Sequence, residues 1–250
     1  MMYYSASMNT LDESLTNAVK EGELLESSLT NIRLLLAGTK SPVAREAVEE
    51  LAAAGEWQEL NDRFYKTLAF GTGGLRGRTI GSIVTRAEQG SGGVNGRPEY
   101  PCVGTACMNY FNVGRAMRGL IIYVKKHVEA TDPGRKPRLV IGHDTRHFSR
   151  DFAEFCAKIG TDLGCDIYLF DSPRATPEVS FAIRELNADS GVVLTASHNP
   201  SHDNGFKAYF NDGAQLVPPH DKAVIEEVNS LTSEESVSYT HLTLPTKLEV

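Results

Sequence analysis

The chain is 250 residues long and carries a formal net charge of −7 at pH 7. This length allows one or two domains with an ample core, and the acidic balance disfavours nucleic acid as a partner. No apolar run approaches the length of a membrane span, so we expect no membrane partner.

Residues 1–66 have a helical pattern and hold most of the excess negative charge. Apolar residues recur near helical spacing over residues 11–36. Ser41-Pro42 is typical of a helix start, with serine as the cap and proline in the first turn. Gly55 is placed to end that helix. We therefore predict a helical amino-terminal extension over residues 1–66.

A glycine-rich segment follows at residues 70–77, with the sequence Phe-Gly-Thr-Gly-Gly-Leu-Arg-Gly. Glycines let backbone N–H groups approach an anion, and an arginine such as Arg76 offers a fork of donors for phosphate. The segment lacks the Gly-Lys-Ser/Thr ending of a P-loop and the third glycine of the dinucleotide fingerprint. Taken alone, it is better explained as a flexible loop.

Helical and strand patterns alternate beyond residue 108. The predicted helices cover residues 109–126, 149–163, 178–186 and 221–231, and the predicted strands cover residues 138–142, 165–170, 191–194 and 206–210. The positions expected to be buried in the first of these helices are Phe111, Val113, Met117, Leu120, Ile121 and Val124. Ser149 is expected to cap the second helix. Such alternation predicts an α/β sandwich with a mostly parallel sheet.

The most informative segment is the hexapeptide Thr-Ala-Ser-His-Asn-Pro at residues 195–200, directly after the strand pattern of residues 190–194. Asn-Pro and Asn-Gly turn signals follow within residues 199–205, so we expect Ser197 on a tight loop at the carboxyl end of a strand. Acyl transfer in α/β hydrolases uses Gly-x-Ser-x-Gly, which the chain lacks. Phosphoryl transfer needs positioning and positive charge, which Lys207 could supply. A serine that only caps a turn is the alternative.

Together, the glycine-rich segment and the hexapeptide resemble the α-D-phosphohexomutase family, the phosphoglucomutases and phosphomannomutases. Residues 141–149, 173–177 and 204–207 are also similar to family segments in order and spacing. The resemblance covers roughly residues 67–235. It implies a three-layer α/β/α sandwich with a mixed, mostly parallel sheet over residues 67–236, the family's catalytic serine domain.

The resemblance also implies roles for individual residues. Ser197 matches the serine that is phosphorylated in the resting enzyme. Lys207 and His198 match residues that stabilise charge or move protons near the transferring group, and Arg76 matches the arginine that reaches the phosphoserine. The other residues expected to bind substrate phosphate are Thr72, Gly73, Arg146 and Asn199.

The reaction implied by the resemblance interconverts hexose 1-phosphate and hexose 6-phosphate through a phosphoserine and a hexose 1,6-bisphosphate. The form of residues 70–77 and the helical extension favour glucose phosphate as substrate, with glucose 1,6-bisphosphate as activator and intermediate. A phosphopentomutase or phosphoglucosamine mutase of the same superfamily, or a phosphate-binding remnant without turnover, remains an alternative. Small sugar phosphates are the expected partners, and the oligomeric state is left open.

Family members hold Mg²⁺ with the phosphoserine and the aspartates of an Asp-x-Asp-x-Asp loop, but this chain contains no Asp-x-Asp. The resemblance therefore leaves Ser197, through its phosphate, as the single magnesium ligand here. The family is also considerably longer, with further domains for the sugar and its distal phosphate. We thus expect an amino-terminal part of a phosphohexomutase that is inactive alone.

Residues 237–250 break with the pattern before them. The sequence Val-Ser-Tyr-Thr-His-Leu at residues 237–242 is what a common transposase sequencing adapter encodes in one reading frame. We therefore expect a non-native tail, which is kept out of fold reasoning. A native β-rich linker is the alternative.

The four cysteines form no Cys-x-x-Cys pair, and the amino terminus shows no secretory signal. Reduced thiols in a cytoplasmic protein are therefore expected. Two His-x3-His spacings, at residues 143–147 and 198–202, are poor zinc candidates because a zinc site needs further ligands.

Overall fold

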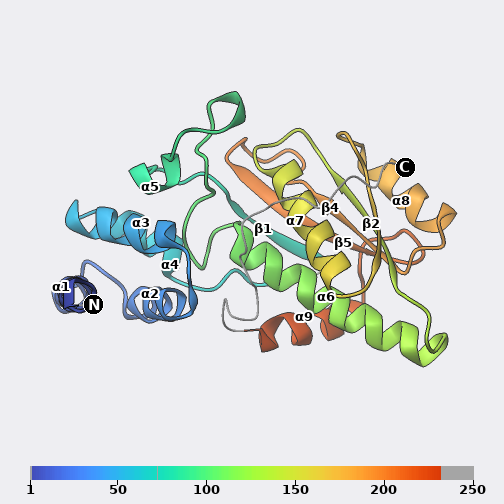
Figure 1. The fold of residues 1–250 in the computed structure, drawn as a ribbon, viewed down its shortest axis with the longest axis horizontal. Helices are drawn as coiled ribbons and strands as arrows, with labels where there is room; N and C mark the ends of the chain where they lie inside the picture. Colours follow the sequence, from blue (N-terminus) through green and yellow to red (C-terminus); the bar gives the residue numbers. More distant parts are fainter. Residues whose placement is uncertain (1, 72, 232–250) are drawn as a thin grey trace.

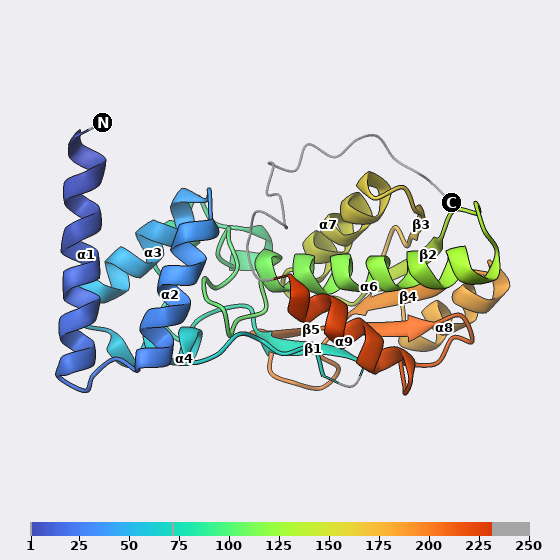
Figure 2. The same ribbon diagram turned by 90° about the horizontal axis from the view of Figure 1, so that it is seen from below.

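A computed structural model describes residues 2–71 and 73–231, in which four helices precede a five-stranded sheet (Figure 1). The predicted tail, residues 237–250, lies outside the described residues. The four helices gather at one end of the molecule, and the sheet with its helices forms the other end (Figure 2). They are α1 (Met2–Lys20), α2 (Glu26–Gly38), α3 (Pro42–Ala53) and α4 (Trp57–Phe64).

The helical extension differs from its sequence pattern in two details. Residues 11–36 are divided between α1 and α2, because the chain turns at Gly22, whose φ of +77° suits glycine. α3 begins at Pro42 with Ser41 in the cap position, as predicted, but the Ser41 side chain makes no capping hydrogen bond. The apolar core of the extension also includes Val103 and Phe111, so the helices are packed onto the rest of the chain.

Five strands form one sheet in the order β1-β5-β4-β2-β3. They are β1 (Gly74–Arg78), β2 (Arg138–His143), β3 (Asp166–Leu169), β4 (Ser190–Leu194) and β5 (Asp203–Phe210). β2 pairs in parallel with β3 and β4, whereas β5 is antiparallel to both β4 and β1. β5 alone is therefore reversed, which confirms the mixed, mostly parallel sheet.

Strand β1 is the element that the sequence analysis missed. Gly71 and Gly74 exchange backbone hydrogen bonds of 2.9 and 3.1 Å in a tight turn, after which the chain runs along β5. A Cβ at Gly74 would lie 1.9 Å from the carbonyl oxygen of Phe206, so this close approach requires glycine. The expectation of a flexible loop was wrong beyond Gly73: the segment is a turn followed by an edge strand that carries Arg76.

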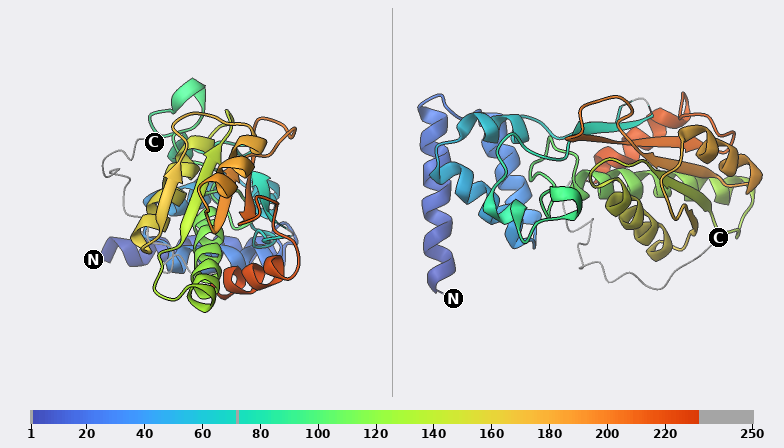
Figure 3. Two further views of the ribbon diagram at one scale, coloured as in Figure 1. Left: turned by 90° about the vertical axis from the view of Figure 1, so that its right-hand side faces the viewer. Right: turned by 90° about the horizontal axis from the view of Figure 1, so that it is seen from above.

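Helices cover both faces of the sheet (Figure 3). α6 (Tyr110–Thr131), α7 (Ser149–Asp162) and α9 (His220–Ser230) share the larger apolar core on one face. α8 (Thr176–Glu185) packs on the other face over a smaller core that includes Val140. This arrangement is the predicted three-layer sandwich.

Two helix predictions need correction in detail. The predicted buried positions of α6 are all buried, but the helix continues to Thr131 rather than ending at Lys126. Ser149 is the first residue of α7 and not its cap, a position taken by Phe148 with a φ of +64°. The Ser149 hydroxyl instead donates to Asp144 Oδ1 at 2.6 Å. This contact ties the start of α7 to the end of β2.

The connection from β1 to α6 contains two short elements, α5 (Arg86–Gln89) and a 3-10 turn (Val94–Gly96). In the part of the chain that the structure describes, no helix combines the length and apolar character needed to cross a bilayer.

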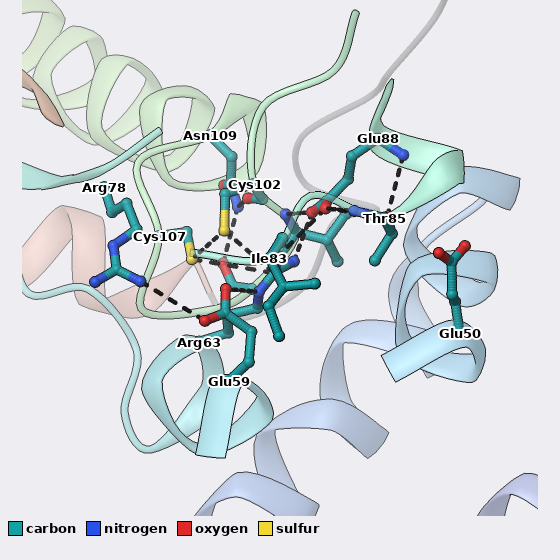
Figure 4. Close-up of polar contacts among 12 residues, drawn as sticks. Glu50, Glu59, Arg63, Arg78, Ile83, Thr85, Glu88, Cys102, Cys107 and Asn109 are labelled. Carbon is teal, nitrogen blue, oxygen red and sulfur yellow. Dashed lines mark hydrogen bonds and ion pairs between the residues drawn. The ribbon is translucent and has the colours of Figure 1, made fainter. Parts of the chain in front are cut away.

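A buried ion-pair cluster joins the helical extension to the rest of the chain (Figure 4). Arg63 on α4 is 1% exposed, and it donates through Nε to Glu59 at 2.8 Å and through Nη1 to Glu88 at 2.6 Å. Its other contacts are the carbonyl oxygens of Ile83 and Val103. Because all three side chains are buried, their charges are tolerable only as a hydrogen-bonded group.

Candidate active site

Ser197 lies on an exposed loop between two central strands, as predicted. β4 ends at Leu194, and residues 195–202, called the serine loop below, lead into β5. Ser197 has a φ of +57°, a conformation that non-glycine residues adopt only when their surroundings hold them. Its backbone N–H donates to Thr195 Oγ1 at 2.9 Å. The loop thus leaves the carboxyl end of a parallel strand, where open α/β sheets bind ligands.

Arg146 holds the serine loop by its backbone. Nη1 donates to the carbonyl oxygens of Pro200 at 2.7 Å and Asp203 at 3.2 Å. Nη2 donates to those of Ser197 at 2.7 Å and Asn199 at 2.5 Å. One planar guanidinium therefore fixes the backbone on both sides of the Ser197–Asn199 turn.

Asp144, just after β2, orients this arginine. Its carboxylate lies 3.4 Å from Arg146 Nε and accepts from the Arg146 backbone N–H at 2.9 Å. Both terminal nitrogens of the guanidinium therefore donate to carbonyl oxygens, and Nε lies beside the Asp144 carboxylate. The sequence analysis expected Arg146 to bind substrate phosphate, whereas these contacts favour a role in positioning the loop.

Asn199 links the serine loop to strand β1. Its Nδ2 donates to Asp203 Oδ2 at 2.9 Å, and its Oδ1 accepts from Arg76 Nη1 at 3.2 Å. Arg76 is exposed on β1 and, through this contact, reaches the serine loop at Asn199. His198 is exposed on the same loop.

Gly73 precedes β1 in a left-handed conformation with a φ of +76°. Its carbonyl oxygen accepts from the backbone N–H of Ala208 at 2.9 Å, so it is fixed against β5. A Cβ at Gly73 would lie 2.4 Å from Gln215 Nε2, so a larger residue would displace that side chain. Thr72, the remaining residue expected to bind phosphate, lies outside the described residues.

Lys207 and Arg76 share one face of the sheet. Lys207 on β5 pairs with Gly74 on β1, so these two residues face the same side of the sheet. Arg76 lies two residues beyond Gly74 on the same strand, and the pleat therefore directs its side chain to that side as well. Partial burial, followed by the nearby Arg76 charge, lowers the pKa of Lys207, and the Asp144 carboxylate opposes this shift. These two cations are therefore close enough to destabilise one another while no anion lies between them.

An open cleft of about 560 Å³ lies at the ends of β2 and β4, in front of Ser197. Its wall includes Arg174, just before α8, and Thr176, the first residue of α8, both from the segment 173–177 noted above only for its similarity to the family. The backbone N–H of Arg174 donates to His143 O at 3.0 Å, which fixes this turn at the end of β2. A helix amino terminus beside an arginine favours an anion. The sequence signal that could have identified this part of the cleft is the Thr176-Pro177 helix start, together with its position directly after a strand.

The described residues do not form a magnesium site by themselves. Within residues 2–71 and 73–231, no three His, Cys, Asp or Glu side chains are grouped so that they could hold a metal ion. Two carboxylates contact this region, those of Asp144 and Asp203, and they are already bonded to Arg146 and Asn199. Mg²⁺ prefers several oxygen ligands, so the donors present do not suffice for it.

Comparisons with known proteins agree with this geometry. A family model described as phosphoglucomutase/phosphomannomutase, alpha/beta/alpha domain I, matches residues 86–235. The chain is 37% identical over 159 residues to a phosphoglucomutase of Staphylococcus epidermidis, a match that covers 64% of this chain and 24% of the relative. It is 31% identical over 194 residues to a phosphoribomutase of Saccharomyces cerevisiae, covering 76% of this chain and 27% of the relative.

A third relative is a phosphopentomutase of Homo sapiens, 31% identical over 195 residues, which covers 76% of this chain and 28% of the relative. The chain spans about a quarter of the length of each of these relatives.

Proposed function

The chain belongs to the phosphoglucomutase/phosphomannomutase family, and from this premise we propose that it carries the phosphoserine domain of a sugar phosphomutase. Ser197 is the proposed carrier of the phosphoryl group. One observation supports this most directly: an exposed serine is held at a φ of +57° by a loop whose carbonyl oxygens are bound by Arg146. Side-chain packing does not explain such a conformation at an exposed position, and backbone strain of this kind is concentrated at functional sites.

The proposed chemistry consists of two phosphoryl transfers. Ser197 Oγ attacks a phosphorus atom of a sugar bisphosphate, the bond from that phosphorus to the sugar oxygen breaks, and the serine proton ends on the released sugar hydroxyl. Phosphoserine then passes its group to a hydroxyl of a sugar monophosphate in the reverse sense. The exposed His198 beside the serine is the proposed proton carrier, because an imidazole can accept and release a proton near neutral pH.

Positive charge near Ser197 supports the same proposal. Phosphoserine brings nearly two negative charges at neutral pH. Arg76 and Lys207 lie close together, and the Arg76 charge lowers the pKa of Lys207. A phosphoryl group between them would replace this repulsion by two attractions, so the pair favours the phosphorylated state.

Arg146 contributes in a different way in this proposal. It positions Ser197 through backbone carbonyl oxygens and keeps its own charge offset by Asp144. Contacts with the substrate phosphate are then proposed for Arg76, Lys207, Gly73 and Thr72.

The substrate we propose is a hexose phosphate, with glucose preferred and glucose 1,6-bisphosphate as the intermediate. The similarity to a phosphoglucomutase supports this choice, but similar phosphoribomutase and phosphopentomutase relatives keep a pentose phosphate as the main alternative. Mg²⁺ is proposed to contact this chain only through the phosphate on Ser197, with its other ligands outside these residues, and would neutralise charge on the transferring group. The buried free thiols support a reducing compartment such as the cytoplasm.

The test is to incubate the chain with glucose 1,6-bisphosphate and Mg²⁺ and to map the phosphopeptide by mass spectrometry. We expect phosphate on Ser197 and none in a Ser197→Ala variant. Ser201→Ala is the matched control, since Ser201 lines the same cleft four residues further along.

A parallel incubation with ribose 1,5-bisphosphate separates the two substrate classes by rate. If Ser197 takes up no phosphate from either donor, the phosphoserine proposal fails and a phosphate-binding remnant is the better description.

A further inference from the structure

Two cysteines lie against each other inside the molecule, away from the serine loop. Cys102 and Cys107 are 1% and 3% exposed, and their sulfur atoms are 3.1 Å apart (Figure 4). This separation is shorter than an ordinary van der Waals contact between two sulfurs. The two sulfur atoms are therefore already close to bonding distance.

The conformation of the loop between the cysteines holds the two sulfur atoms close together. Gly104 has a φ of +156°, and a Cβ there would lie 2.6 Å from the carbonyl oxygen of Arg63 and 2.9 Å from Cys107 Sγ. Asn109 Nδ2 donates to the carbonyl oxygens of Cys102 at 2.9 Å and Gly104 at 2.8 Å. Glycine thus lets the chain double back, and the asparagine fixes the backbone that carries the sulfurs.

A charged side chain and a cavity lie beside the buried thiols. The Arg63 guanidinium lies near the thiols, and its positive charge opposes the rise in the pKa of Cys102 that the hydrogen bond to Cys107 and burial cause. Cys102 also belongs to the wall of a cavity of about 490 Å³ between the start of α3 and residues 99–111. A small reagent entering this cavity would meet Cys102 before Cys107.

We propose that Cys102 and Cys107 form a redox modification site, which a small disulfide such as glutathione disulfide converts into an intramolecular disulfide. The Cys102 thiolate attacks one sulfur of the reagent and releases one glutathione thiol. Cys107 then attacks the Cys102 sulfur of the mixed disulfide and releases the second. Two protein thiols are oxidised, one glutathione disulfide is reduced, and the two thiol protons end on the two glutathione molecules.

Little movement is needed for this reaction. A disulfide requires the sulfurs to approach by about 1 Å from their present separation. The loop is bonded to the end of β1, because the N–H groups of Cys102 and Met108 donate to the carbonyl oxygens of Thr79 and Arg78. Oxidation would therefore fix a loop that supports the strand carrying Arg76.

The reaction is expected to be slow at neutral pH and faster in alkali. Hydrogen bonding to Cys107 and burial raise the pKa of Cys102, although Arg63 opposes the shift. Only the thiolate attacks, so the rate of disulfide formation should rise as the pH rises. Cys156 is a suitable internal comparison, because it is fully buried and burial likewise raises its pKa.

The experiment treats the folded chain with glutathione disulfide at several pH values, blocks the remaining thiols and maps disulfides by mass spectrometry. We expect a peptide linked through Cys102 and Cys107, a mass loss of two hydrogen atoms, and reversal by dithiothreitol. Cys156→Ser should behave like the wild type, whereas Cys102→Ser and Cys107→Ser should lose the mass change.

Other outcomes would overturn the proposal. These are a stable mixed disulfide without ring closure, a bond to Cys156 or Cys165, or loss of the Cys102 and Cys107 thiols no faster than that of Cys156. The wild-type map alone decides between these outcomes, so the test stands even if a serine variant fails to fold.

Discussion

Two arginines hold two parts of this molecule together through different kinds of acceptor. Arg63 is 1% exposed and binds two buried carboxylates at the junction with the helical extension. Arg146 has a side chain that is 12% exposed and binds mainly backbone carbonyl oxygens of the serine loop. Two buried carboxylates offset the Arg63 charge, whereas Arg146 has the single carboxylate of Asp144 and gives its terminal N–H groups to carbonyl dipoles. The first arrangement therefore suits a joint that must stay closed, and the second suits a site that must receive anions.

The difference also predicts how each region responds to the loss of its arginine. Removing Arg63 would leave Glu59 and Glu88 without their main counter-charge where water is excluded. Removing Arg146 would free carbonyl oxygens on a loop whose residues 197, 198 and 200 are exposed, so water can replace the lost donors. Stability should therefore depend mainly on Arg63, and phosphoryl transfer mainly on Arg146.

The largest effect is expected for Arg63→Met. Uncompensated Glu59 and Glu88 carboxylates should lower the free energy of unfolding by about 3–5 kcal/mol. The measurement is urea denaturation followed by circular dichroism. Arg33→Ala is the control, because Arg33 pairs with Asp12 in an exposed ion pair, and its loss should cost less than about 1 kcal/mol.

A triple variant tests the reason for that loss. Replacing Arg63 by Met together with Glu59→Gln and Glu88→Gln removes both carboxylate charges and should recover part of the lost stability. If the triple variant is less stable than Arg63→Met, the cost does not come from unpaired buried charge.

The second prediction concerns Arg146→Ala. Loss of its carbonyl contacts should misplace Ser197 and slow its phosphorylation about a hundredfold, which is the scale for a misplaced reacting group. The KM for glucose 1,6-bisphosphate should change little, because the arginine holds the loop and not the phosphate. Arg146→Lys should recover only part of the rate, since one ammonium cannot span carbonyl oxygens on both sides of the turn.

Arg150→Ala is the control for this measurement, because Arg150 is an exposed residue on α7 that pairs with Glu154. A large rise in KM with the maximal rate retained would instead support the contact with substrate phosphate that the sequence resemblance implied for Arg146.

The smallest expected effect concerns Lys207 and pH. Burial and the Arg76 charge lower the pKa of Lys207 below its usual value of 10.5. The unfolded chain therefore binds the lysine proton more tightly than the folded chain does. Below the folded pKa, the charged lysine lowers the free energy of unfolding. This loss disappears as the pH rises towards 10.5, because the folded chain releases the proton first. Lys207→Met should raise the free energy of unfolding at pH 7, by less than about 1 kcal/mol after solvent screening.

The advantage of Lys207→Met over the wild type should shrink as the pH approaches 10.5, and Lys222→Met on α9 serves as the exposed control. A variant that is less stable than the wild type at pH 7 would mean that Lys207 makes favourable contacts that outweigh its burial.

The sequence alone located Ser197 correctly, because a β-branched strand followed by two turn signals has few other structures. It also predicted α6 and its buried positions, since long apolar periodicity is a strong signal. It did not predict β1, whose Gly-Leu-Arg-Gly-Arg sequence lacks a strand pattern and is extended only because the edge of β5 offers hydrogen-bond partners.

The sequence by itself therefore determined the alternation of helices and strands, the serine loop and the family to which the chain belongs. Tertiary structure decided what each arginine does, because a guanidinium acts on whatever acceptors the fold brings to it. Arg146 meets carbonyl oxygens more than fifty positions away along the chain, and Arg63 meets Glu88, contributed by a separate helix. Contacts between residues so far apart leave no local pattern, since the chain between them must fold before either partner is in place.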